Sequence, residues 1–147
     1  MRILIQRVSR ASVRVAGEVI AEIGQGLLAL AGVAEGDTED EVRWMAEKLA
    51  QIRIFEDSEG KMNRSLEDTG GSVLVVSQFT LYGELKKGNR PNFMAAAEPV
   101  KAERMYELLL HYLRTRLGER RVRAGRFRAT MSVELSNEGP VTMLLER

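Results

Sequence analysis

The sequence has no cysteine and only one histidine among its 147 residues. The absence of cysteine excludes a disulfide framework, a catalytic thiolate and any Cys-ligated metal site. His111 could act as a general base, but its position in a stretch of helical periodicity favours a boundary residue of an amphipathic helix. No Ser-His-Asp set, HExxH motif, Walker loop or GxGxxG motif can be found. If the protein is an enzyme, it lacks the usual acid–base side chains, and we expect neither a metal nor another cofactor.

Long hydrophobic runs are also missing. No run reaches the ~18 apolar residues that would span a membrane. The opening MRILIQRVSR carries charges where a signal peptide would need apolar residues, so we expect a cytoplasmic protein. The length, with 44% hydrophobic and 29% charged residues, is typical of one soluble globular domain spanning residues 1–147.

The formal net charge is only +1, but basic residues gather in two places. One cluster, within ERRVRAGRFRAT, consists of Arg120, Arg121, Arg123, Arg126 and Arg128. The other, within LKKGNRP, consists of Lys86, Lys87 and Arg90. Such clusters can bind a phosphate backbone, or they can form the solvated edge of a strand. Charge alone leaves both interpretations open.

Alternating and apolar stretches predict strands in the first half of the chain. Residues 1–9 and 11–23 have the composition of strands, and the second stretch is expected to fold as a hairpin on Ala16-Gly17-Glu18. The nearly continuous apolar run 26–33 is typical of a strand covered on both faces. A further β-branched strand is predicted over residues 72–79.

Two helices are predicted between the strands. The first has a capping box formed by Thr38 and Glu41, apolar residues at helical spacing, and an end near Gln51. The second begins near Pro99, a residue that fits the first helical turn, and ends before Gly118. The inward face of the second helix is expected to consist of Met105, Leu108, Leu109, Tyr112 and Leu113.

Two remaining stretches are polar or interrupted. Residues 56–71, EDSEGKMNRSLEDTGG, are expected to be a loop with little structure of its own. Residues 130–146 are expected to form a strand, a turn at Gly139-Pro140 and a second strand. Strands outnumber helices and both helices lie between strands, which predicts an α/β fold with one mixed, partly closed sheet system and the helices on one side.

A polar segment follows the buried strand. Ser77, Gln78 and Thr80 come directly after the residues VLVV, at a strand end, where binding and catalytic residues are commonly placed. Alternatively, the strand becomes exposed at an edge and is anchored by Phe79 and Leu81. These residues alone do not decide between the two interpretations.

The dipeptide Gly139-Pro140 at the expected turn is unusual, because a turn rarely uses glycine and proline together in that order. It can be a simple tight turn, since proline is common at the second position of such turns. Alternatively the bond is cis, a state that about 5% of X-Pro bonds adopt in folded proteins. Turn statistics alone favour the simple turn.

The segments SQFTLYG, GNRPNFMAAAEP and NEGPVT together resemble the D-aminoacyl-tRNA deacylase family. The resemblance extends over essentially the whole chain, including the opening MRILIQRVSRASVRV, and SQFT combined with NxGPVT is more specific than either motif alone. Three positions depart from the family's pattern: Glu138 replaces the usual aspartate, Asn92 a common serine, and Arg128 a usual glycine. Arg128 is the departure expected to reshape the pocket wall near Phe127.

The resemblance implies the fold and the assembly. It implies mixed, largely antiparallel, barrel-like β-sheets with two helices packed on one side, a three-layer β/β/α arrangement. It also implies a homodimer with its active sites at the dimer interface. Each site would combine Ser77, Gln78, Phe79 and Thr80 of one subunit with a cis Gly139-Pro140 turn of the other.

The resemblance also implies the activity, which is hydrolysis of the ester bond of D-aminoacyl-tRNA. Gly139 and Pro140, with Phe127 and Asn137, would bind substrate and exclude L-amino acids, whose side chains would meet fixed backbone. Glycyl-tRNA could not be rejected in this way. The tRNA would be bound by basic residues, namely Lys86, Lys87, Arg90, Arg121 and Arg123.

Two mechanisms are compatible with the motif. In one, a ribose hydroxyl of the RNA assists, while backbone N–H groups at Phe79 and Thr80 hold the ester carbonyl. In the other, Thr80 is a covalent nucleophile, which would need an adjacent base that the sequence does not show. The missing base favours the first. Outside this activity, a non-catalytic RNA-binding module using the arginine cluster and a purely structural dimerisation domain are the alternatives.

Overall fold

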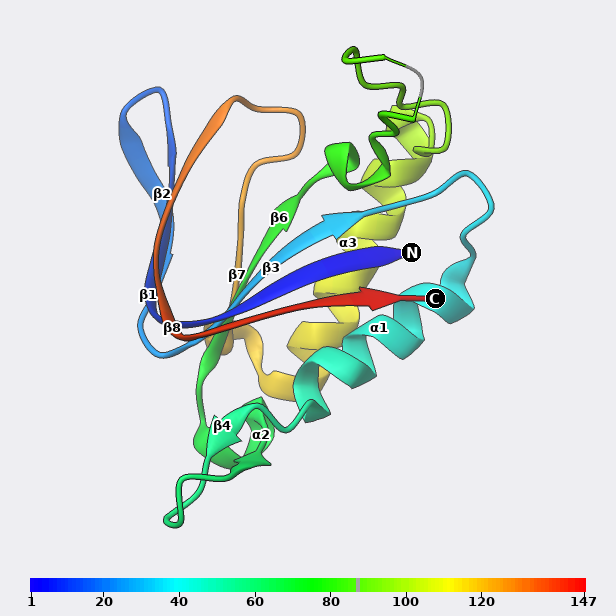
Figure 1. Ribbon diagram of the computed structural model, residues 1–147. Coiled ribbons are helices and arrows are strands. Elements are labelled where there is room, and N and C mark those ends of the chain that lie inside the picture. The colour runs from blue at the N-terminus through cyan, green and yellow to red at the C-terminus, as the bar shows by residue number, and fades with distance from the viewer. Residues whose placement is uncertain (87) are drawn as a thin grey trace.

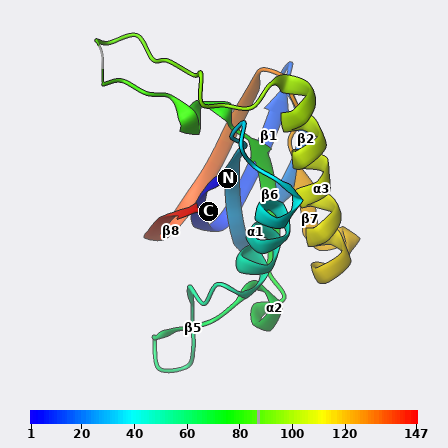
Figure 2. The same ribbon diagram turned by 90° about the vertical axis from the view of Figure 1, so that its right-hand side faces the viewer.

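The computed structural model describes residues 1–86 and 88–147. Lys87, from the second basic cluster, lies outside the described residues. The strands form a strongly curved sheet, and two long helices cover one of its faces (Figures 1 and 2).

The strand β1 (Arg2–Val15) organises the sheet, because three other strands pair with it. Its first half pairs antiparallel with β3 (Gly26–Gly32), and its second half pairs antiparallel with β2 (Glu18–Ile23). The strand β8 (Met131–Glu146) runs antiparallel along the other side of β1 over nearly its whole length. The two ends of the described chain therefore lie side by side (Figure 1).

Two parallel strands extend the sheet from β3. The strand β6 (Ser72–Ser77) pairs with β3, and β7 (Val122–Ala124) pairs with β6, so the sheet is mixed. The apolar run of β3 is buried along almost its whole length, as expected for a strand covered on both faces. The hairpin predicted between β1 and β2 is confirmed, and its turn residues Ala16 and Gly17 both have the positive φ of a type I′ turn.

The two predicted helices are present with the expected boundaries. The helix α1 (Glu39–Gln51) begins with the Thr38–Glu41 capping box, and α3 (Pro99–Leu117) begins at proline and ends before Gly118. The predicted inward face of α3 is confirmed, with Leu108 and Tyr112 packing half-buried against the core. The residues of α3 that are buried are Met105, Tyr106, Leu109, Leu110, Leu113 and Leu117. No helix in residues 1–86 or 88–147 is long and apolar enough to cross a membrane.

The prediction of an unstructured loop over residues 56–71 was wrong. This stretch holds most of a short hairpin, β4 (Phe55–Glu56) with β5 (Met62–Arg64), followed by the helix α2 (Leu66–Thr69). Hydrogen bonds from side chains stabilise this hairpin and helix. The carboxylate of Asp57 accepts hydrogen bonds from the Asn63 amide and from the Lys61 and Glu59 backbone N–H groups, and these bonds lower the pKa of Asp57. Ser65 then starts α2 with a second capping box.

Two hydrophobic cores lie on opposite faces of the sheet. The larger core fills the space between α1, α3 and the sheet. The smaller core lies where the far ends of β1, β2 and β8 fold over the other face of β3 and β6, and it consists of Val8, Ala11, Val13, Ala21, Ile23, Leu28, Leu74 and Val76. The two cores separate three layers, which confirms the expected partly closed β/β/α arrangement, with α2 as an additional short helix.

The tail of the chain differs from the predicted strand, turn and strand. Residues 131–146 form the single strand β8, which remains paired with β1 on both sides of Gly139-Pro140. The register changes there, since Gln6 lies opposite Thr142 whereas Val8 lies opposite Asn137. Four residues of β8 thus lie opposite Arg7 alone, which makes the segment a bulge. Glycine and proline inside a strand commonly mark such a bulge, and the Gly139-Pro140 bond in it is cis.

Candidate active site

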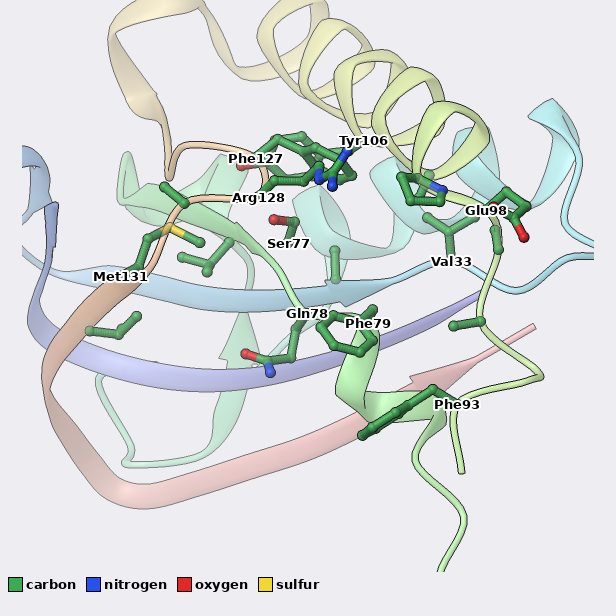
Figure 3. Close-up of a pocket in the computed structure, with 18 residues that line it drawn as sticks. Val33, Ser77, Gln78, Phe79, Phe93, Glu98, Tyr106, Phe127, Arg128 and Met131 are labelled. Atoms are coloured by element: carbon green, nitrogen blue, oxygen red, sulfur yellow. The ribbon is translucent and has the colours of Figure 1, made fainter. Parts of the chain in front are cut away.

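A cavity of about 620 Å³ opens at the end of β6, between that strand, the first turns of α3 and the segment that joins β7 to β8 (Figure 3). Its floor and walls are mainly small and apolar. These lining residues are Ala31, Val33, Val76, Ala96, Ala97, Pro99, Ala102, Ala129, Met131 and Val133. The remaining lining side chains are aromatic, polar or charged and lie where β6 ends and where the β7–β8 segment passes.

The predicted residues at the end of β6 line this cavity. Ser77, Gln78 and Phe79 face into it, and the chain then enters a short 3-10 helix, η1 (Phe79–Tyr82). The backbone is fixed at this point because Gln78 N–H donates to the Ala31 carbonyl at 2.7 Å. The first N–H groups of a helix have no partner within it, and those of Phe79 and Thr80 make no hydrogen bond to a described residue. Two polar backbone groups are thus available beside the cavity.

Thr80 does not line the cavity. Its side chain is exposed, and its hydroxyl oxygen accepts a hydrogen bond from the amide nitrogen of Gln78. An amide nitrogen cannot remove a proton, so the described structure gives this hydroxyl no base.

Two phenylalanines form one side of the cavity. The rings of Phe79 and Phe93 meet edge to face, with 5.0 Å between centroids, although 58% of Phe79 is exposed. Gly83 makes room for this pair, since a Cβ there would lie 2.9 Å from the Phe93 ring. Phe93 belongs to the segment NRPNF, but sequence reasoning did not identify it as a site residue.

Tyr106 builds the opposite wall and was also missed by sequence reasoning. Its buried hydroxyl lies 2.9 Å from the Val75 carbonyl and 3.3 Å from the Gly125 carbonyl. It therefore connects α3 with β6 and with the segment after β7. Burial raises the pKa of Tyr106, so the hydroxyl remains a neutral donor. A tyrosine at an inward-facing helical position was the available signal, because a buried phenol needs a hydrogen-bond partner.

Phe127 and Arg128 follow on this wall. The Phe127 ring packs against Tyr106, with 6.0 Å between centroids, so Phe127 lies where it was predicted to. Arg128 lines the cavity next to it, and its φ is +60°. Arg128 and Glu98 are the two charged residues among those that line the cavity.

Gly139, Pro140 and Asn137 lie elsewhere in the chain. None of them lines this cavity, and Gly139 instead borders a second, more polar cavity of about 390 Å³. The second cavity is lined by Arg7, Gln25, Phe55, Glu56, Arg64, Thr69, Glu138 and Gly139. Within one chain, the structure does not bring the two predicted halves of the site together.

The buried side chain of Arg7 holds the bulge. Its guanidinium donates to the Ile54 carbonyl at 2.7 Å and to the Glu138 carbonyl at 3.3 Å, and it lies 3.5 Å from the Glu56 carboxylate. Gly139 has a φ of +113°, and a Cβ there would come within 3.1 Å of both Arg7 and the Val141 nitrogen. The position therefore needs glycine for its backbone as well as for space.

Asn137 is fixed from the other side of the bulge. Its side-chain amide nitrogen donates to the Thr142 hydroxyl at 2.9 Å. The side-chain oxygen, Oδ1, is buried without a described partner. The bulge is thus bonded to Arg7 of the neighbouring strand, and the residues on its two sides, Asn137 and Thr142, are bonded to each other.

The basic residues predicted to bind tRNA have different surroundings. Lys86, Arg90 and Arg123 are exposed. Arg121 instead donates to the carbonyls of Gly71 and Leu66, so it holds α2 against the end of the sheet. The described residues contain no group of three or more acidic or histidine side chains that could hold a metal ion.

The fold agrees with comparisons to known proteins. Residues 4–146 match the model of the family described as D-Tyr-tRNA(Tyr) deacylase. The chain belongs to this family, whose members are hydrolases acting on an ester bond.

Individual relatives match at full length. The chain is 57% identical over 146 residues to a D-aminoacyl-tRNA deacylase of Shouchella clausii, covering 99% of each chain. It is 54% identical to a D-aminoacyl-tRNA deacylase of Chloroherpeton thalassium, covering 99% of this chain and 95% of that one. A solved structure titled c-Myc DNA Unwinding Element Binding Protein aligns with a TM-score of 0.95 at 41% identity, covering 100% of this chain and 99% of that one.

A second solved structure supports the fold alone. It is titled a structural analysis of a probable eukaryotic D-amino acid tRNA deacylase, and it aligns with a TM-score of 0.86 at 19% identity. The alignment covers 98% of this chain and 97% of the other.

Proposed function

We propose that this protein hydrolyses the ester bond of D-aminoacyl-tRNA, releasing the D-amino acid and the tRNA in the cytoplasm. The observation that carries the proposal is the cavity at the end of β6, which the SQF segment lines in a chain that belongs to the deacylase family. Its volume of about 620 Å³ is in the range of small-ligand sites and suits an aminoacylated nucleoside.

The chemistry needs placement more than acid–base side chains. An aminoacyl ester is already activated, so hydrolysis requires a water directed at the carbonyl carbon and donors for the developing oxyanion. The backbone N–H groups of Phe79 and Thr80, which have no described acceptor, are the donors in this proposal. The neighbouring ribose hydroxyl of the RNA assists the attack, the ester C–O bond breaks, and the leaving ribose oxygen takes up a proton.

The surroundings of Thr80 support RNA-assisted hydrolysis over a covalent threonine. Its hydroxyl lies outside the cavity lining and accepts from the Gln78 amide rather than from a base. An unactivated threonine hydroxyl is a weak nucleophile.

The complete site requires two subunits in this proposal. The protein forms a homodimer, and the Gly139-Pro140 bulge of each subunit reaches the cavity of its partner. Two observations support this arrangement. The bulge lies outside the cavity of its own chain, and β8 is an edge strand with Leu135, Met143 and Leu144 exposed on it. An exposed edge of this kind readily pairs with another chain.

Selectivity for the D-enantiomer follows from the rigid bulge. The backbone of Gly139 and Pro140 occupies the space that an L side chain would need, while a D side chain points away from it. Glycine has no side chain to reject, so glycyl-tRNA is a second substrate in this proposal.

Release of amino acid from D-Tyr-tRNA, L-Tyr-tRNA and Gly-tRNA tests the activity. We expect cleavage of the D and glycyl esters, and retention of the L ester. Two adjacent residues of α3 provide a matched pair of variants. Ala102→Phe fills the cavity and should abolish cleavage, whereas Glu103→Phe adds the same ring at an exposed position and should not. Binding of tRNA without cleavage would instead support the RNA-binding alternative.

Mixing two inactive variants tests the shared site. Ala102→Phe damages a cavity and Gly139→Ala damages a bulge, so a heterodimer of the two retains one intact pair. By statistical mixing of a two-fold dimer, the mixture should recover about one quarter of wild-type activity. If the bulge serves the cavity of its own chain, mixing restores nothing.

A further inference from the structure

Arg128 is the most unusual residue of the cavity wall. Its φ of +60° places it in the left-handed region, which bulky side chains rarely adopt. A non-glycine residue in this conformation is held there by its surroundings, and such strain concentrates at binding sites. The strained position here carries a cation on the wall of the main cavity.

The guanidinium of Arg128 has no partner in the described part of the chain. It forms no hydrogen bond or ion pair with a described residue, and the residue is exposed. Figure 3 shows Arg128 on the same side of the cavity as Phe127 and Tyr106, across from Phe79 and Phe93. By contrast, Arg121 in the same cluster is occupied by two carbonyls.

The stretch of chain that leads to Arg128 carries further positive charges. Arg123 and Arg126 are exposed on the segment that leads to Arg128 from β7. The carboxylate among the lining residues is that of Glu98, at the start of α3. Three exposed arginines therefore follow one another along the chain between β7 and the cavity wall.

We propose that Arg128 binds a phosphate of the RNA, the phosphodiester that adjoins the terminal nucleoside. This inference rests on the proposed function. The cavity is lined mainly by apolar side chains and holds the nucleoside and its acyl group, so the strongly hydrated phosphate stays at the exposed side where Arg128 lies. There, a guanidinium can bind two phosphate oxygens at once. Arg128 thus distinguishes an ester on RNA from the same ester on a free nucleoside.

Arg128→Gly is a suitable test variant, because glycine adopts the same φ without strain and folding should not suffer. Arg128→Lys keeps the charge but not the planar fork. Lys61→Ala is the matched control, since it removes one exposed cation on the β4–β5 hairpin, at the opposite end of the molecule from the cavity (Figure 1). The substrates are D-Tyr-tRNA, D-Asp-tRNA and D-tyrosine esterified to adenosine, which has no phosphate.

The first measurement is the ratio of kcat/KM on D-Tyr-tRNA to that on D-tyrosyl-adenosine. We expect Arg128→Gly to lower this ratio about fivefold, a typical effect of one partly exposed charged contact. Arg128→Lys should lower the ratio less, and Lys61→Ala should leave it at the wild-type value. The second measurement is binding of uncharged tRNA against salt, where loss of one phosphate contact on a single strand should reduce the log–log slope by about 0.7.

Three results would overturn the assignment. An unchanged ratio together with an unchanged salt slope would show that Arg128 contacts no phosphate. An equal loss on both tyrosyl esters would place its contact on the nucleoside or the acyl group. A selective loss on D-Asp-tRNA would mean that it binds an acidic side chain of the amino acid. If wild-type protein cleaves no D ester, the proposed function fails, but the salt slope still tests the phosphate contact.

Discussion

The end of β6 and the bulge of β8 are both predicted parts of one site, but they are built in different ways. The cavity at the end of β6 is complete in one chain, and backbone hydrogen bonds and the Tyr106 hydroxyl fix its walls. The bulge borders a different cavity and is held mainly by one buried side chain, that of Arg7. Substitutions that leave the cavity open should therefore cost less than substitutions in the bulge.

The largest effect is expected at Gly139, where the bulge has no space and no conformational tolerance. Gly139→Ala would place a Cβ within 3.1 Å of Arg7 and of the Val141 backbone at a φ of +113°. We expect cleavage of D-Tyr-tRNA to fall about a hundredfold, the usual cost of misplacing a group at a reacting centre by ~1 Å. The free energy of unfolding should fall by about 1–2 kcal/mol, as measured by urea titration.

Gly36→Ala is the control for this variant. A Cβ at Gly36 meets nothing within 4 Å, and its φ is not in the left-handed region. If both variants behave like wild type, the bulge has no role in the reaction and the comparison with the cavity loses its basis.

The next largest effect on activity, with the largest loss of stability, is expected at Arg7. Arg7→Met keeps an unbranched apolar chain but leaves the buried carbonyls of Ile54 and Glu138 without a donor. We expect the free energy of unfolding to fall by about 2–4 kcal/mol, with activity reduced in the protein that remains folded.

Arg14→Met, on the same strand, provides the comparison. Arg14 is partly exposed, and its ion pair with Glu134 at 3.3 Å lies at the surface, so its loss should cost less than about 1 kcal/mol. Equal costs at the two positions would show that burial of Arg7 is not what stabilises the bulge.

Tyr106→Phe tests the cavity wall with a smaller change. It removes the hydroxyl from the Val75 and Gly125 carbonyls but keeps the ring. We expect a loss of about 1 kcal/mol in the free energy of unfolding and a severalfold fall in kcat/KM, since Phe127 and Arg128 follow Gly125 in the chain. Tyr112→Phe, which alters an exposed hydroxyl on the same helix, should change kcat/KM much less. Indistinguishable kcat/KM values would remove Tyr106 as a positioning residue.

The smallest effect is expected at Thr80. Because its hydroxyl lies outside the cavity lining, Thr80→Ala should lower kcat/KM by less than about tenfold, and Thr80→Ser should resemble wild type. Removal of a covalent nucleophile costs on the order of a thousandfold or more. A loss of that size, with an acyl-enzyme trapped in the wild type, would establish the covalent mechanism instead.

Elements with local signals could be predicted from the sequence. The capping box at Thr38 and the proline at position 99 define the starts of the two long helices, and the Ala16-Gly17 turn defines the hairpin. Each signal depends on residues a few positions apart. The polar strand end at Ser77 was identified for the same reason, as an abrupt change of character after a buried run.

Features that depend on distant residues were missed or misread. The hairpin of β4 and β5 forms because the Asp57 carboxylate gathers donors from three other residues, a pattern without hydrophobic periodicity. Arg7 was not identified from the sequence, and the structure shows it buried against Ile54 and Glu138. The tail resembled two strands because nothing local shows that both parts have the same neighbour.

The long ladder between β1 and β8 has a consequence for how the chain folds. Arg2 lies opposite Glu146, 144 positions away, so this pairing closes nearly the whole chain into a loop. Closing large loops is entropically costly, and folds dominated by such distant pairings reach the native state slowly. The helices and the β1–β2 hairpin can form early, whereas the bulge exists only once this last ladder closes. The bulge and the part of the cavity lining that β8 supplies, Met131 and Val133, therefore take their places late in folding.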